Sequence, residues 1–143
     1  MNYIESGKKE GAKLVCGGNK IDRDGYFVET TIFADVTNDM TIAKEEIFGP
    51  VMSIIKFSDV DEAVKLANDS KYGLAAGVIT KDLNTAINVS NKLQAGIVWV
   101  NTWISMNPST PFGGFKESGM GREQGEKSLD GYLESKTIVI KHE

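Results

Sequence analysis

Cysteine and histidine are nearly absent from this chain of 143 residues, which contains one of each. A lone cysteine excludes an internal disulfide framework and fits a reducing compartment, so the cytoplasm is the default expectation. The sequence also has no Cys-x-x-Cys pair and no cluster of metal-ligating residue types. We therefore expect no metal site.

An excess of positive charge is missing as well. The chain has 16 Lys and Arg against 20 Asp and Glu, a formal net charge of −4, whereas a nucleic-acid module needs a basic face to neutralise phosphates. No apolar run approaches the ~18 residues of a membrane span, and the first residues lack the basic and apolar segments of a signal peptide. We expect a globular protein with neither a nucleic-acid nor a membrane partner.

The pattern between residues 51 and 100 predicts the fold class. Three apolar segments typical of strands alternate with two amphipathic helices whose apolar residues recur at helical spacing. This order is typical of an α/β fold, with a parallel-type sheet and flanking helices. The expected strands are 51–57, 74–80 and 97–100, with 74–80 buried.

Polar residues and one glycine mark the ends of these two helices. Ser58 followed by Asp61 resembles a capping box for the first helix, and Asp82 can cap the second. Gly96 lies where a left-handed residue would end the second helix.

Shorter elements are expected on both sides of this region. Residues 3–11 favour a helical piece and residues 13–16 a short apolar strand. The segment 101–121 is irregular because prolines and glycines interrupt it. A helix with an apolar face at 129–133 and a last strand at 137–141 follow.

Cys16 is the one candidate thiol nucleophile. A working thiolate needs exposure and a nearby base or cation, whereas Cys16 follows the apolar residues Leu14 and Val15. Isolated cysteines often serve as small buried hydrophobic side chains, and we expect that structural role here.

The glycine-rich segment at 113–125 invites comparison with phosphate-binding loops. Gly119, Gly121 and Gly125 have the spacing G-x-G-x-x-x-G, one residue off the dinucleotide fingerprint, and no strand directly precedes them. A tight loop is the favoured interpretation.

Two further groups stay open on spacing alone. Glu45 and Glu46 are either a solvated surface or carboxylates that a rigid turn presents to ligand hydroxyls. The aromatic residues Trp103, Phe112 and Phe115 either pack down the irregular segment or line an apolar pocket.

Four segments together closely resemble the aldehyde dehydrogenase superfamily. They are Ala-Lys-Glu-Glu-Ile-Phe-Gly-Pro-Val at 43–51, Tyr-Gly-Leu-Ala-Ala-Gly at 72–77, Ala-Gly-Ile-Val-Trp-Val-Asn-Thr at 95–102, and Pro-Phe-Gly-Gly-Phe-Lys-Glu-Ser-Gly-Met-Gly-Arg-Glu at 111–123. The resemblance implies the C-terminal part of a catalytic domain at 1–134 and an interface strand at 135–143, without the Rossmann domain.

A complete enzyme of this family is expected to oxidise aldehydes to carboxylic acids with NAD or NADP. Its nucleophile is a Cys in a Gly-Gln-x-Cys setting and its general base a Glu in a segment resembling Glu-Leu-Gly-Gly; neither string is present here. The resemblance therefore implies no catalytic residue in this chain, no activity of the chain alone and no tight binding of NAD or NADP to it.

Several ligand-binding positions do match the family pattern. Glu46 matches the carboxylate that binds the nicotinamide-ribose hydroxyls, and Phe48 matches an aromatic residue at the nicotinamide end. The implied aldehyde pocket comprises Asn101, which begins its loop, and the residues Ile104, Ser105, Met106 and Phe112.

Two interpretations of the whole chain follow. In the first, it is a segment of an NAD(P)-dependent aldehyde dehydrogenase. In the second, it is a truncated paralogue that acts as a non-catalytic binding or assembly protein. Both predict association, either as a homo-oligomer or with a full-length subunit.

Overall fold

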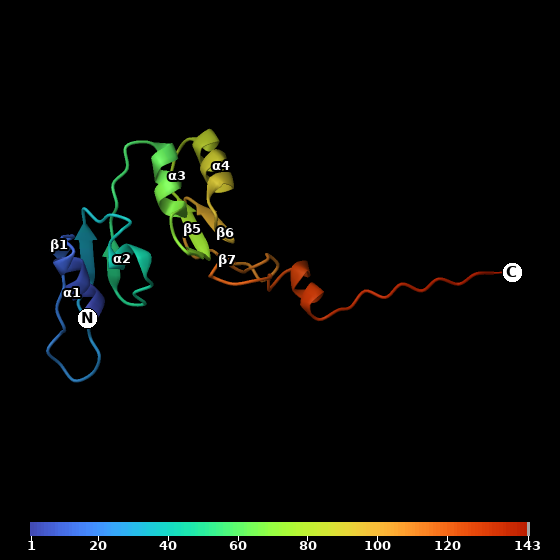
Figure 1. Cartoon of the computed structure of the whole chain (residues 1–143), viewed down its shortest axis with the longest axis horizontal. Helices are drawn as coiled ribbons and strands as arrows, with labels where there is room; N and C mark the ends of the chain where they lie inside the picture. Colours follow the sequence, from blue (N-terminus) through green and yellow to red (C-terminus); the bar gives the residue numbers. More distant parts are fainter. Residues whose placement is uncertain (143) are drawn as a thin grey trace. The chain divides into compact units, whose positions relative to one another are not determined.

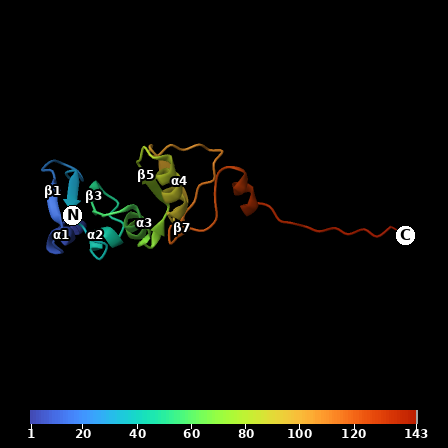
Figure 2. The ribbon, with the colours of Figure 1, turned by 90° about the horizontal axis from the view of Figure 1, so that it is seen from above.

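The computed structural model describes residues 1–142, in two compact units, Met1–Ser70 and Lys71–Glu143. The first unit combines helices with a three-stranded sheet, and the second combines helices with two two-stranded sheets (Figures 1 and 2). The predicted α/β class is confirmed. Within the described residues, no helix has both the length and the apolar character that a membrane crossing requires.

The first unit contains a three-stranded sheet in the order β1-β2-β3. Strand β1 (Lys13–Cys16) pairs antiparallel with β2 (Thr31–Ala34), and β2 pairs parallel with β3 (Val51–Ser53). The helices of this unit are α1 (Asn2–Lys9), α2 (Thr41–Lys44) and α3 (Val60–Asn68).

The core of the first unit forms around Phe33, whose side chain is fully buried in β2. Ile4 of α1 and Ile42 of α2 pack in the same cluster. A Cβ added at Gly7 would lie 3.0 Å from Ile42 Cδ1 and 3.1 Å from Phe33 Cζ. The glycine in α1 therefore lets this helix approach the core closely, which places α1 beside α2.

Helix α3 is confirmed, but its cap lies one residue later than predicted. Asp59 is the N-cap, and its carboxylate accepts a hydrogen bond from the backbone N–H of Glu62 at 2.8 Å. Glu62 in turn accepts hydrogen bonds from the backbone N–H and hydroxyl of Ser58, both at 2.6 Å. Asp59 thus takes the N-cap role expected of Ser58, and the Glu62 side chain reaches back to Ser58, one residue before the cap, where a capping box would have it bond to the N–H of the cap residue itself.

The second unit is built on a parallel pair of strands connected by a helix. Strands β5 (Ala75–Val78) and β6 (Ile97–Val100) pair in register, and α4 (Leu83–Lys92) contacts both. Asp82 caps α4 as predicted, because its carboxylate accepts from the backbone N–H of Thr85 at 2.6 Å. The parallel pairing predicted for this part is confirmed.

Three short elements complete the second unit. Strand β4 (Tyr72–Gly73) pairs antiparallel with β7 (Phe115–Lys116), and the 3-10 helix η1 (Glu126–Gly131) follows. The helix predicted with an apolar face at Leu129, Tyr132 and Leu133 is only partly present: η1 ends at Gly131, so Leu129 alone of the three lies in it, and all three side chains are exposed.

Other expectations for this region also need correction. The strand at 51–57 is shorter and pairs with β2, so it does not join the sheet of β5 and β6. The strand at 74–80 is shorter, and of its residues in β5 only Val78 is buried. Both differences arise because strand pairing is decided by distant chain segments, which hydrophobic periodicity does not identify.

Gly96 is not the left-handed residue that we expected. Helix α4 already ends at Lys92, with Leu93 as its C-cap, and Gly96 is not among the residues with positive φ. A Cβ at Gly96 would lie 1.6 Å from the carbonyl oxygen of Gly113. Close approach of two backbone segments therefore requires this glycine.

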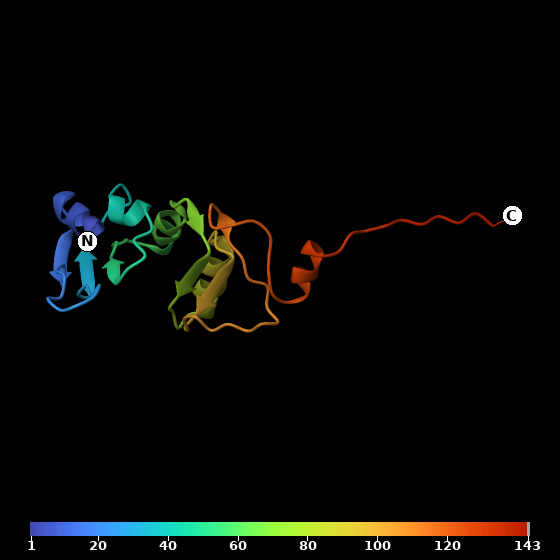
Figure 3. The same ribbon diagram turned by 90° about the horizontal axis from the view of Figure 1, so that it is seen from below.

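The last strand predicted at 137–141 is not paired in the described part of the chain. These residues form an extended run, visible as the red trace in Figure 3. A strand needs a neighbour to satisfy its backbone hydrogen bonds, so pairing of this segment stays a prediction about an assembly. The boundary expected at residue 134 also stays a prediction.

Candidate functional site

Glu46 and Phe48 lie on the segment that connects α2 to β3 in the first unit. Both side chains are exposed, and the Phe48 ring is 94% exposed. Phe48 has a φ of 51°, in the left-handed region that a bulky residue rarely adopts. The exposed Glu46 carboxylate can accept hydrogen bonds from hydroxyl groups. The exposed Phe48 ring, two residues later, can pack against a flat ring.

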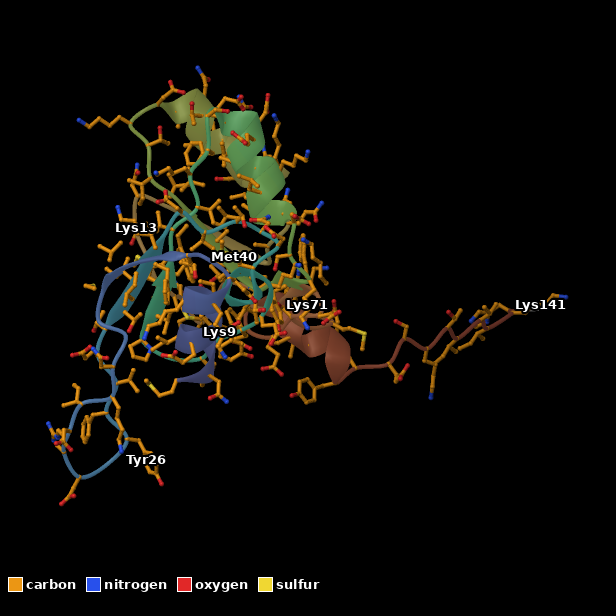
Figure 4. All side chains as sticks on the ribbon, turned by 60° about the vertical axis from the view of Figure 1, so that its left-hand side comes forward. Lys9, Lys13, Tyr26, Met40, Lys71 and Lys141 are labelled. Carbon is orange, nitrogen blue, oxygen red and sulfur yellow. The ribbon has the colours of Figure 1, made fainter. Side chains whose placement is uncertain are left out.

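Contacts from α1 hold the start of this segment. The Glu10 carboxylate accepts hydrogen bonds from the backbone N–H of Thr41 at 2.7 Å and from its hydroxyl at 2.5 Å. These bonds, with the Thr41 hydroxyl first, lower the pKa of Glu10 below its ordinary value. In Figure 4, Lys9 and Met40 mark the neighbouring ends of α1 and α2.

Two more hydrogen bonds fix the segment on either side of Glu46. The Tyr3 hydroxyl of α1 donates to a carboxylate oxygen of Glu45 at 2.9 Å. The carbonyl of Pro50 accepts from the backbone N–H of Thr31 at 2.8 Å, where β2 begins. Glu45 thus bonds to α1, whereas the Glu46 side chain is exposed to solvent.

Asn101 lies at the end of β6 in the second unit and clamps the end of β5. Its amide oxygen accepts from the backbone N–H of Thr80 at 2.9 Å, and its amide nitrogen donates to the carbonyl of Thr80 at 2.8 Å. Its own backbone N–H donates to the carbonyl of Val78 at 2.8 Å. With a φ of 54°, Asn101 turns the chain out of the sheet and into the following loop.

The loop after Asn101 carries exposed apolar side chains. Ile104 and Met106 are both exposed, and Ile104 has a φ of 52°. Trp99 of β6 contacts this loop: its ring packs edge-on against Trp103 with centroids 5.0 Å apart, and its Nε1 donates to the carbonyl of Ser105 at 2.7 Å. Trp103 therefore packs against Trp99, while 61% of its side chain stays exposed.

Phe112 lies further along the same irregular segment and is partly buried. Its backbone N–H donates to the carbonyl of Glu123 at 2.7 Å, and the N–H of Glu123 donates back at 2.8 Å. This bridge joins the two ends of the glycine-rich segment and fixes the backbone at Phe112.

The glycine-rich segment itself is a tight loop. Arg122 Nη1 donates to the carbonyls of Gly114 at 3.1 Å and Gly121 at 2.6 Å. The Ser118 hydroxyl accepts from the backbone N–H of Gly73 at 2.9 Å, which attaches the loop to β4. These internal contacts support the tight loop that we favoured over a phosphate-binding loop.

Cys16 is exposed, so the expected burial is wrong. It lies on β1, at the edge of the three-stranded sheet, where all four side chains are exposed. Its sulfur lies 3.8 Å from the carbonyl of Thr30. Among residues 1–142, no group of three or more His, Cys, Asp and Glu side chains is arranged to hold a metal ion.

The predicted site residues therefore form two groups. Glu46 and Phe48 share one exposed segment of the first unit; Asn101, Ile104, Met106 and Phe112 share the irregular segment of the second. Sequence reasoning missed the residues that hold these segments, namely Glu10, Tyr3 and Trp99. Glu10 and Thr41 are 31 positions apart, and no local pattern connects them.

Comparison with known proteins gives one consistent result. The family described as "Aldehyde dehydrogenase family" matches residues 1–138. The chain is 59% identical to aldehyde dehydrogenase 1A1 of Mesocricetus auratus over 141 residues, which are 99% of this chain and 28% of that protein. The chain therefore spans little more than a quarter of this relative's length.

Solved structures agree. The NAD+ complex of aldehyde dehydrogenase from Bacillus cereus superposes with a TM-score of 0.90 at 54% identity, over 93% of this chain and 27% of that one. The Mycobacterium tuberculosis aldehyde dehydrogenase complexed with NAD+ gives a TM-score of 0.93 at 44% identity, over 98% and 29%. On sequence and on fold, this chain belongs to the aldehyde dehydrogenase family.

Proposed function

We propose that this chain is a segment of an NAD(P)-dependent aldehyde dehydrogenase and supplies it with cofactor-binding and substrate-binding residues. The observation that carries the proposal is the pairing of Glu46 with Phe48: both are exposed, and the strained backbone at Phe48 presents the ring to solvent. Strained backbone of this kind is concentrated at functional sites.

The proposed cofactor contacts follow from the chemistry of these two side chains. The Glu46 carboxylate accepts hydrogen bonds from the ribose hydroxyls, which fixes the sugar, and the Phe48 ring packs against the nicotinamide end. When bound, NAD or NADP accepts a hydride from the substrate carbon. Glu10 and Tyr3 support this function indirectly, because they hold the chain on the α2 side of Glu46.

The proposed substrate contacts lie in the second unit. Ile104, Met106 and Phe112 offer an apolar wall to the aldehyde chain, and such a wall excludes water from the reacting carbon. Asn101 is a positioning residue, since both atoms of its amide bond to Thr80. The proposal also includes an aldehyde as the substrate and association as a homo-oligomer or with a full-length subunit. It further includes a cytoplasmic location.

A second candidate is a binding or assembly role without catalysis. The observation that favours it is the exposed apolar face of α4, where Leu83 is 71% and Ile87 is 51% exposed. Apolar side chains so exposed on one helix favour a protein partner. Both candidates predict that the 143 residues alone do not turn over aldehydes, because the covalent chemistry of the family requires an activated cysteine.

Two assays test the proposal. The purified chain should reduce no NAD with acetaldehyde or longer aldehydes above a heat-treated control. Turnover that disappears in Cys16→Ala would make Cys16 the nucleophile and overturn the assignment.

The second assay uses a chimera in which these 143 residues replace the matching segment of the Bacillus cereus enzyme. The chimera should be active, and Glu46→Gln should raise its KM for NAD. A folded, active chimera whose KM for NAD is unchanged by Glu46→Gln would contradict the cofactor role. A folded but inactive chimera would favour the non-catalytic candidate.

A further inference from the structure

The two tryptophans of this chain, Trp99 and Trp103, form one packed pair. Their rings meet edge to face, 5.0 Å apart at the centroids and at 64°. Trp99 also donates its Nε1–H to the carbonyl of Ser105 at 2.7 Å. One residue of strand β6 thus contacts the following loop twice, on either side of Ile104.

Gly77 lies directly opposite Trp99 in the parallel pairing of β5 and β6. Residues paired across neighbouring strands present their side chains to the same face of the sheet. A Cβ added at Gly77 would lie 2.9 Å from Cζ3 and 3.0 Å from Cε3 of Trp103. The ring of Trp103 therefore fills the space beside Trp99 that a side chain at position 77 would take, as aromatic rings do over glycine in sheets.

We propose that Trp99 and Gly77 are positioning residues that fix the course of the loop at 103–106, and that they thereby set which aldehydes the site accepts. The inference rests on the proposed function, in which Ile104 and Met106 contact the aldehyde. Trp99 and Gly77 act through the loop and need not touch the substrate.

The backbone at Ile104 explains why the loop needs two anchors. Its φ of 52° is costly for a β-branched residue and persists only where the surroundings enforce it. Two contacts enforce this conformation. Directly before Ile104, the ring of Trp103 packs over Gly77. Directly after Ile104, the carbonyl of Ser105 accepts a hydrogen bond from Trp99. Loss of either anchor lets Ile104 relax to an extended conformation and redirects its side chain.

Gly77→Ala in the 143-residue chain tests the first anchor. Position 77 has an ordinary backbone conformation, so the added methyl conflicts only with the Trp103 ring. We expect the near-ultraviolet circular dichroism of the tryptophan pair to be lost and acrylamide quenching to increase. Gly131→Ala is the matched control, because nothing lies within 4 Å of its added Cβ. A wild-type spectrum in Gly77→Ala, or no tryptophan signal in the wild type, overturns the proposal.

Trp99→Phe tests the second anchor, since it keeps a ring and removes the donor to Ser105. Amide hydrogen exchange at 104–106 should become about fivefold faster, the factor that one typical hydrogen bond provides. Tyr132→Phe, which changes a largely exposed ring in η1's C-cap residue, should leave that exchange unchanged. Equal exchange in Trp99→Phe and wild type contradicts the proposal.

The chimera separates this inference from the proposed function. There, Gly77→Ala should change the ratio of kcat/KM between a short and a long aldehyde, whereas Gly131→Ala should not. If the spectrum of Gly77→Ala changes in the chain but the ratio stays constant, the loop is not the aldehyde loop, and the assignment of Ile104 and Met106 fails. If the ratio changes while the spectrum does not, the anchoring mechanism fails and the assignment stands.

Discussion

The carboxylate of Glu10, the C-cap residue of α1, caps the first turn of α2 by accepting two hydrogen bonds from Thr41. A helix of four residues has no unaided stability in water. Helix α2 therefore depends on α1 for its start and on Ile42 for its place in the core. Glu46 lies two residues after the end of this helix, so its position depends on a carboxylate 36 positions earlier in the chain.

Replacement of this carboxylate gives the first prediction. Glu10→Gln should lower the stability of the chain at about pH 7, because an amide offers one acceptor oxygen in place of two. The hydrogen bond from the Thr41 hydroxyl lowers the pKa of Glu10. The stabilisation by this carboxylate is therefore complete above the ordinary pKa of a Glu in the unfolded chain. It is lost as the pH falls through the lowered pKa of Glu10 in the folded chain. Urea unfolding at about pH 7 and about pH 3 measures it.

The difference in stability between Glu10→Gln and wild type should shrink as the pH falls, because a growing fraction of the wild-type carboxyl is then protonated. Glu126→Gln, at an exposed position in η1, serves as a control. A difference between Glu10→Gln and wild type that grows in acid would show that the Glu10 carboxylate does not cap α2.

The amide clamp at Asn101 gives the second prediction. Asn101→Gly removes both side-chain hydrogen bonds to Thr80 but tolerates the positive φ, and it should cost about 1–2 kcal/mol. Asn101→Ala adds the backbone strain and should cost about 1 kcal/mol more. Tryptophan fluorescence during urea unfolding measures both, since Trp99 and Trp103 lie beside the clamp in sequence. Equal stability of Asn101→Gly and wild type would refute a structural role for the amide.

Cofactor affinity gives the third prediction. One carboxylate and one ring cannot replace a phosphate site at a helix N-terminus, so the isolated chain should bind NAD more weakly than about 1 mM, or about −4 kcal/mol. Isothermal titration calorimetry measures this affinity. Micromolar binding would reveal a site that Glu46 and Phe48 do not explain, and the variant Glu46→Gln would show whether they contribute to it.

Association gives the fourth prediction. The apolar face of α4 and the extended residues at 137–141, where Ile138, Val139 and Ile140 are exposed, both favour contact with another chain. A net charge of −4 offers limited repulsion. The isolated chain should be oligomeric, prone to aggregation or marginally stable, and removal of residues 136–143 should weaken a specific dimer. Sedimentation of a stable monomer that binds no apolar dye would argue against this prediction.

Elements with local signals were predictable from the sequence. Helix α4 follows its cap Asp82 as expected, and α3 differs from prediction only in a cap moved from Ser58 to Asp59. These features depend on residues within one turn of each other. The parallel pairing of β5 and β6 was also predictable, because a strand, a helix and a strand in sequence favour it.

Features that depend on distant residues were not predictable. The exposure of Cys16 follows from the edge position of β1, and the need for glycine at position 96 follows from a carbonyl 17 residues later. For the candidate site, the family pattern supplied Glu46 and Phe48 by their motif. It did not supply Glu10 or Gly77, whose roles exist only once the chain has folded.

The left-handed backbone at Phe48 and Ile104 bears on how this sequence can change. Each position carries a conformational cost of about 1–3 kcal/mol that glycine or asparagine would largely remove. A selection for heat resistance alone would therefore enrich glycine or asparagine at positions 48 and 104. Each such gain in stability would remove a side chain that is proposed to contact the cofactor or the aldehyde. Thermostable variants that keep activity should instead carry their stabilising substitutions at other positions. In a lineage that no longer needs catalysis, residues 48 and 104 would be the first to vary.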